Sequence, residues 1–343
     1  MSEPVSRILD GAVPPAENTH LFGHQDAEDL LGQTYAAGKI HHAILLEGPE
    51  GIGKATLAFR FAHHILAHPD PATAPARIGA PDPDTAEFRT IAAGASHNLV
   101  HLVRPVDDKT QKIKTAITVD EVRKIAKFLG QTTGNNNWRI IVIDVADELN
   151  RNAANAILKM LEEPPRRTIF LVLSHHPGRL LPTIRSRCMT LLLRPLGDAD
   201  MRAAIAHLGL PVPPEQMDRV VAASAGSVAT AIKLVNYGGL EIVDAFEQLL
   251  NKPARGQRRE IHRLAEVLAG KDREDAFDFF ADHVGQYVAA QARRSALAGD
   301  HLRADRLSRL HAALFERLAI ADGYNLDRKQ TVLSLLGDVV QSL

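Results

Sequence analysis

The stretch GPEGIGKAT at residues 48–56 constrains the fold more than any other part of this sequence. It follows the pattern G-x-x-x-x-G-K of a phosphate-binding loop, with Gly48, Gly53 and Lys54 in place. Such a loop needs a buried strand before it and a helix after it, because backbone N–H groups at the helix N-terminus hold the phosphates. The apolar run at 43–46 and the helical spacing of apolar residues after Lys54 supply both.

Short apolar strands and amphipathic helices continue to alternate up to about residue 195. Further strands are expected at 97–105, 139–145, 168–174 and 188–193, with helices at 119–130 and 151–163. This alternation favours a parallel sheet with helices on both of its faces. The segment 66–96, which is rich in Pro and Ala, is interpreted as an excursion from that core.

Beyond about residue 196 the strand signals fade and the pattern becomes helical. Helices are expected at 198–208, 214–224, 227–236, 239–251, 258–269, 273–297, 301–320 and 328–342. We therefore predict a flexible lead-in at 1–20, an α/β domain at 21–195, a small helical lid at 196–238 and an all-α domain at 239–343.

Composition excludes several classes of protein. The chain has 343 residues, 45% hydrophobic and 24% charged, which suffices for two or three packed domains. Its single cysteine, Cys188, rules out an internal disulfide and a multi-cysteine zinc site, and fits a cytoplasmic location. The sequence contains no run of roughly 18 apolar residues, so no membrane contact is expected. A net charge of -1 argues against a protein that binds DNA through its overall charge.

The loop lacks parts that nucleotide hydrolysis requires. Hydrolysis needs a hydroxyl for Mg²⁺ after the lysine, an Asp at the end of a second strand and a carboxylate that orients water. Asp144 supplies the strand-end Asp, but Ala55 stands at the hydroxyl position and Val145 at the water-orienting position. Thr56 cannot simply replace the hydroxyl, because one helical step turns it about 100° away.

The candidate nucleotide-contacting residues are Gly48, Gly51, Gly53, Lys54, Thr56 and Asp144. The loop backbone and Lys54 still allow weak binding of ATP or ADP, whereas hydrolysis is expected to be very slow. Asp147 and Glu148, beyond the strand end, are candidates to replace the missing base. The nearby histidines His63, His64, His68 and His97 have no thiolate partner, so we expect no zinc.

Two further motifs follow the strand that ends at Asp144: NAANAILKMLEEPP at 152–165 and LPTIRSRC at 181–188. In this order and spacing they resemble the clamp-loader branch of the AAA+ family, over most of 20–236 and more weakly in the C-terminal helices. The resemblance implies an AAA+ domain, a helical lid and a C-terminal collar. It also implies a ring with tau/gamma and delta subunits that places a sliding clamp on primed DNA.

In such rings each ATP site lies at an interface, where the next subunit donates the arginine of the SRC motif. The resemblance assigns this role to Arg187, with Arg185 as the fallback, and the planar guanidinium suits the charge of a γ-phosphate. The family's second sensor, an arginine in the lid, is replaced by Ala229. Ser174, at a strand end, either matches the first sensor or makes a local backbone hydrogen bond. Glu162 and Glu163, both in LEEPP, are given an interface or structural role rather than one in acid–base catalysis.

The leading hypothesis is a non-hydrolysing subunit that lends Arg187 to a neighbour and requires no cofactor. It is expected to catalyse no reaction itself and to be a component of the DNA polymerase holoenzyme. An active tau/gamma-like ATPase is the alternative, and Ala55, Val145 and Ala229 argue against it. A nucleic-acid-binding module with a decayed loop is the third hypothesis, which the net charge and the 5% aromatic content oppose.

Overall fold

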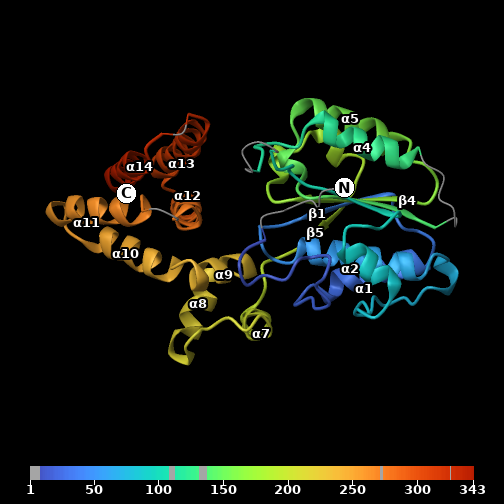
Figure 1. Cartoon of the computed structure of the whole chain (residues 1–343). Coiled ribbons are helices and arrows are strands. Elements are labelled where there is room, and N and C mark those ends of the chain that lie inside the picture. Colours follow the sequence, from blue (N-terminus) through green and yellow to red (C-terminus); the bar gives the residue numbers. More distant parts are fainter. Residues whose placement is uncertain (1–7, 108–112, 131–136, 271–272, 325) are drawn as a thin grey trace. The chain divides into compact units, whose positions relative to one another are not determined.

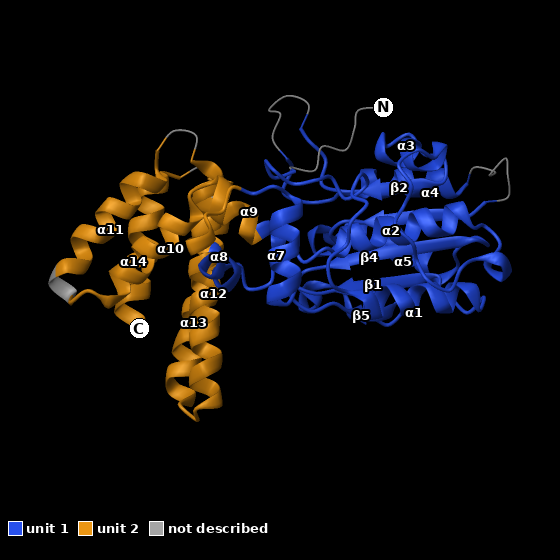
Figure 2. Ribbon diagram, turned by 90° about the horizontal axis from the view of Figure 1, so that it is seen from below, with its two compact units in different colours: residues 1–210, 217–229 blue, residues 211–216, 230–343 orange. Residues whose placement is uncertain are grey.

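The computed structural model describes residues 8–107, 113–130, 137–270, 273–324 and 326–343. The chain divides into two compact units, one of residues 1–210 and 217–229 and the other of residues 211–216 and 230–343 (Figure 2). The first seven residues of the predicted lead-in lie outside the described residues. The domain boundaries predicted at 20, 195 and 238 stay predictions.

A five-stranded sheet in the order β2-β3-β4-β1-β5 forms the centre of the first unit, and all of its strand pairs are parallel. Its strands are β1 Ala43–Glu47, β2 Leu99–Leu102, β3 Arg139–Ile143, β4 Thr168–Ser174 and β5 Met189–Leu192. All strands predicted from the sequence are confirmed. Every residue of β1 and β4 is buried, because helices cover both faces of the sheet, and this explains their unbroken apolar runs.

Two pairs of helices cover the sheet (Figure 1). They are α1 Gln25–Ala36 and α2 Lys54–Ala67 on one face, and α4 Val119–Leu129 and α5 Arg151–Glu162 on the other. Successive residues of β4 enter the two cores in turn, so Leu171 packs with the α1–α2 core and Phe170 with the α4–α5 core. The predicted α/β fold is thus confirmed.

The segment 66–96 is packed onto this domain, so its interpretation as an excursion from the core was wrong. Ile78 and Ile91 are buried in the α1–α2 core. Gly32 of α1 allows the close approach, because a Cβ atom there would lie 2.4 Å from the carbonyl oxygen of Ala76. The two apolar anchors are widely spaced in a Pro- and Ala-rich stretch, which left no periodic signal.

The remaining elements are helical. They are the helices α3 Ala86–Ala92, α6 Pro182–Arg185, α7 Asp198–His207, α8 Met217–Ser224, α9 Val228–Asn236, α10 Gly239–Asn251, α11 Ala254–Leu268, α12 Glu274–Leu297, α13 His301–Gly323 and α14 Arg328–Ser342, and the 3-10 turns η1 Pro71–Thr73, η2 Ala146–Glu148, η3 Pro177–Arg179 and η4 Pro214–Gln216. Every helix predicted beyond residue 196 is confirmed. In the second unit the ring of Phe246 packs edge-on against that of Phe280, with centroids 6.4 Å apart. None of the described helices combines the length and apolarity that a bilayer span requires.

The side chain of Asn150 caps α5 by accepting a hydrogen bond from the backbone N–H of Ala153 at 2.9 Å. We expect Asn150→Ala to lower the free energy of unfolding by about 1 kcal/mol, because that N–H loses its partner. Urea denaturation measures the change. Asn152→Ala, at an exposed position of the same helix, is the matched control and should change stability by less than about 0.5 kcal/mol. Equal losses in the two variants would contradict the capping role.

Candidate nucleotide and interface site

The sheet brings the predicted nucleotide-site residues to one edge. In a parallel sheet the carboxyl ends of the strands lie together, and ligands of α/β proteins bind there. The loop 48–53 follows β1, Asp144 follows β3 directly, and Ser174 is the last residue of β4. The predicted turn is confirmed: Gly51 and Gly53 have φ angles of 75° and 103°, in the left-handed region, and α2 begins at Lys54.

The ammonium group of Lys54 is turned onto the carbonyls of its own loop. Its Nζ donates to the carbonyl oxygen of Gly48 at 2.7 Å and to that of Pro49. The side chain is buried, and burial lowers its pKa to about 8 against the opposing charges of Asp144 and Glu50. The loop therefore satisfies its lysine without a phosphate.

The start of α9 covers the middle of the loop. The backbone N–H of Val228 donates to the carbonyl oxygen of Gly51 at 2.9 Å. A Cβ atom at Gly51 would lie 2.4 Å from the Cβ atom of Ala229 and 2.5 Å from the Oγ atom of Ser227. Ala229, predicted to replace an arginine, thus packs its methyl group on the loop.

Asp147 is committed to holding the end of β4. Its carboxylate accepts hydrogen bonds from the hydroxyl of Ser174 at 2.7 Å, from the backbone N–H of His175 at 2.6 Å and from that of His176 at 2.9 Å. Three donors occupy this carboxylate, so it has a structural use that competes with a role as a base. The same bond gives the Ser174 hydroxyl a partner inside the chain.

Glu148, the other candidate base, pairs with Arg104, whose Nε atom lies 2.9 Å from its carboxylate. Burial nevertheless raises the pKa of Glu148 to about 7, because desolvation outweighs the charge of Arg104 and the carboxylates of Asp144 and Asp147 add to the rise. Asp144 itself lies 3.4 Å from the Nε2 atom of His101. Sequence reasoning missed His101 and Arg104, because neither belongs to a motif.

The two positions at which hydrolysis would require a hydroxyl and a water-orienting carboxylate are part of the hydrophobic core. Val145 is buried in the α1–α2 core, and Ala55 packs against the same cluster. Thr56 is buried on α2, one helical step further round. The site thus assembles Lys54 and Asp144 beside apolar groups where the hydroxyl and the water-orienting carboxylate would stand.

Arg187 lies outside this cluster, after α6, and has two partners in the chain. Its Nη1 atom donates to the carbonyl oxygen of Thr183 at 2.9 Å, and its Nη2 atom donates to the Oε1 atom of Glu162 at 2.6 Å. Arg185 instead faces the end of β1, where its Nε atom lies 3.7 Å from the buried carboxylate of Glu47, too far for a hydrogen bond. Sequence spacing contains no signal for the pairing of Arg187 with Glu162.

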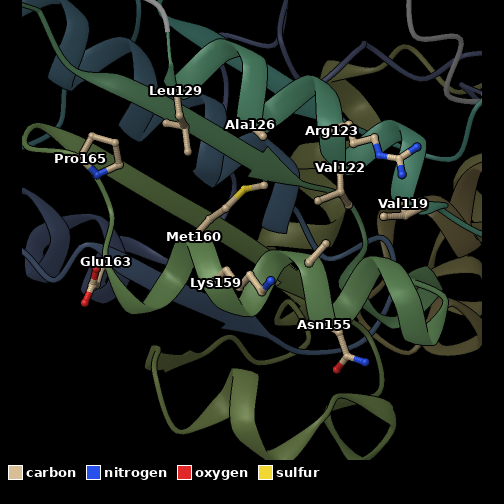
Figure 3. Close-up of a pocket in the computed structure, with 11 residues that line it drawn as sticks. Val119, Val122, Arg123, Ala126, Leu129, Asn155, Lys159, Met160, Glu163 and Pro165 are labelled. Atoms are coloured by element: carbon tan, nitrogen blue, oxygen red, sulfur yellow. The ribbon is translucent and has the colours of Figure 1, made fainter.

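A separate groove of about 650 Å³ lies between α4 and α5 (Figure 3). Its lining is mostly apolar, with Leu129 and Met160 among its members, and includes Glu163. None of the predicted nucleotide-site residues lines it. Across the residues that the structure describes, no group of His, Cys, Asp and Glu side chains is arranged to hold a metal ion.

Known proteins resemble this chain over much of its length. A family model described as DNA polymerase III, delta subunit, matches residues 23–197. The chain is 34% identical to DNA polymerase III subunit delta' of Pseudomonas aeruginosa over 70% of each protein. It is 30% identical to the Escherichia coli delta' subunit over 61% of this chain and 58% of that protein. Identity to the E. coli tau subunit is 26%, over 65% of this chain and 33% of tau.

The raised pKa of Glu148 makes stability depend on pH. The folded protein keeps the proton of this carboxyl up to about pH 7, whereas the unfolded chain loses it near 4.5. Its contribution to stability therefore falls as pH rises between these two values and stays low above them. Glu148→Gln keeps the neutral form at every pH, so we expect it to be more stable than the wild type at about pH 8, with a smaller difference at about pH 5.

Urea denaturation of both proteins at the two pH values measures this effect. Asp120→Asn, at an exposed carboxylate paired with Arg123 on the surface of α4, is the control and should show little pH-dependent difference. A Glu148→Gln variant that differs from the wild type equally at both pH values would show that the carboxyl titrates normally.

Proposed function

Because the chain belongs to the delta prime family of DNA polymerase III clamp-loader subunits, we propose that it lends an arginine to a neighbouring subunit and hydrolyses no ATP itself. In this proposal it assembles with tau/gamma and delta subunits in the cytoplasm. The ring opens a sliding clamp and places it on primed DNA. The polymerase reaction belongs to the holoenzyme, and this chain supplies structure and one side chain.

The state of the loop is the observation that carries the non-hydrolysing half of the proposal. An incoming triphosphate has to draw Lys54 away from the two carbonyls that hold it. It also finds no hydroxyl at Ala55 to bind Mg²⁺. These costs support a subunit that needs no nucleotide.

Arg187 supports the other half of the proposal. A guanidinium carries five N–H donors in one plane. Two of its nitrogens each donate one bond inside the chain, to Thr183 and Glu162. The side chain is 34% exposed, so part of it is open to an anion from outside. An arginine supplied in trans to a transferring phosphate contributes about 10³- to 10⁵-fold to turnover at its site.

We expect Arg187→Ala to remove the ATP turnover of the one site that it serves, while the loader still assembles. Steady-state ATP hydrolysis by the reconstituted loader, with clamp and primed DNA, measures this loss, and size-exclusion chromatography checks assembly. Arg151→Ala, at an exposed arginine at the other end of α5, is the matched control and should leave turnover unchanged. An unchanged rate for Arg187→Ala in an intact complex would refute the donation.

The isolated chain should neither turn over ATP nor gain stability from it. We expect no rise in Tm with millimolar MgATP or MgADP, whereas a ligand present at a hundred times its Kd would add about 2.7 kcal/mol. Differential scanning fluorimetry and a hydrolysis assay make the two measurements. Turnover by the chain alone that Lys54→Ala abolishes would establish the opposite function, that of an active motor subunit.

A further inference from the structure

We propose that Glu162 is a positioning residue for Arg187, holding one side of its guanidinium so that the other side stays available to a neighbour's phosphate. The inference rests on the proposed donation of Arg187 and deepens it, because it assigns the contact that orients the donated group. The group that Arg187 would contact is a nucleoside triphosphate, because the planar fork of a guanidinium matches anionic phosphate oxygens.

Two contacts on different nitrogens fix the plane of the guanidinium. The bonds from Nη2 to Glu162 and from Nη1 to Thr183 measure 2.6 and 2.9 Å. An exposed arginine otherwise samples many rotamers, and immobilising it costs entropy at the moment of binding. In the described part of the chain the other N–H groups of Arg187 have no partner, so a donor edge is left over after the two contacts form.

Both anchors of Arg187 sit beside residues locked in one hydrophobic core. Leu161, which precedes Glu162, and Ile184, which follows Thr183, are each 1% exposed and belong to the same cluster. The backbone at both anchors is therefore held in place by that cluster. A donated group held by such neighbours is preorganised, and a displacement of about 1 Å at a reacting centre costs up to about a hundredfold in rate.

The position of Glu162 is unfavourable without its partner. It is the last residue of α5, where the helix end has partial negative charge, and a second carboxylate, Glu163, follows it. Pro164 and Pro165 prevent the helix from continuing. A cation at this place offsets the repulsion; Arg187 provides one by direct contact with Glu162, and Lys159 supplies another in the last turn of the helix.

The competing explanation is an ion pair that merely ties α5 to α6. The side chains of Arg187 and Glu162 are 34% and 49% exposed, and pairs this exposed contribute little to stability. Removing the carboxylate should therefore shift the Tm of the isolated chain by less than about 2 °C. A positioning role predicts a second effect that stability does not explain, on the turnover of the assembled loader.

The test compares ATP hydrolysis by reconstituted loaders that carry Glu162→Gln, Arg187→Ala or both. We expect Glu162→Gln to remove about half or more of the turnover that Arg187→Ala removes, by lowering kcat while the KM for ATP is unchanged. Glu163→Gln, at the next residue, is the matched control and should leave turnover at the wild-type level. The side chain of Glu163 lines the α4–α5 groove (Figure 3).

The double variant separates the two explanations. If Glu162 acts only through Arg187, adding Glu162→Gln to Arg187→Ala causes no further loss. Additive losses, or full activity of Glu162→Gln beside a defective Arg187→Ala, would overturn the positioning role and leave the proposed donation intact. Full activity of both single variants would instead refute the donation itself.

Discussion

Burial of the adjacent strands β1 and β4 on both faces is the constraint from which the site follows. Strands covered by helices on each side have no room for polar side chains along their length, so polar groups emerge only at the strand ends. Parallel pairing puts those ends at one edge. The phosphate-type loop and the residues bonded to Asp147 meet there because the interior excludes them.

At that edge the polar groups are engaged with one another. Lys54 is bonded to its own loop, Asp147 holds the end of β4, and Glu148 faces Arg104. In a nucleotide-hydrolysing protein, groups at equivalent places bind phosphate, metal and water. The frame that delivers them is the same in both cases. What differs is that this chain uses them as internal contacts, which is consistent with the non-hydrolysing role proposed above.

The elements that the sequence predicted well were those with a clear hydrophobic period. The strands and the helices beyond residue 196 have such a period. Helix α1 was not predicted, and its buried face explains why: it includes Glu28 and Gly32 beside Leu31. Glu28 is tolerated there because Arg60 lies 2.7 Å away, and Gly32 because another segment packs against it. Both exceptions depend on partners far along the chain, which periodicity does not report.

In the candidate site, too, some features were predicted from the sequence and others were not. The glycine loop, Lys54 and Asp144 were predicted from motif and order, because backbone geometry and strand ends leave local signatures. The contacts of Arg187 with Glu162 and of Glu148 with Arg104 were not, since they join segments brought together only by the packed sheet. The individual groups were thus predicted from the sequence, whereas their pairing became visible only in the fold.

The contact between the loop and the start of α9 decides which change would have to come first if this chain were engineered into an ATP-hydrolysing subunit. A hydroxyl at Ala55 needs only one added oxygen atom at a partly buried position. An arginine at Ala229 needs space that the loop occupies, because the methyl group of Ala229 packs on Gly51 and Val228 is bonded to it. A designer would therefore have to move the start of α9 before changing the chemistry, since a longer side chain at position 229 would meet the backbone of the loop.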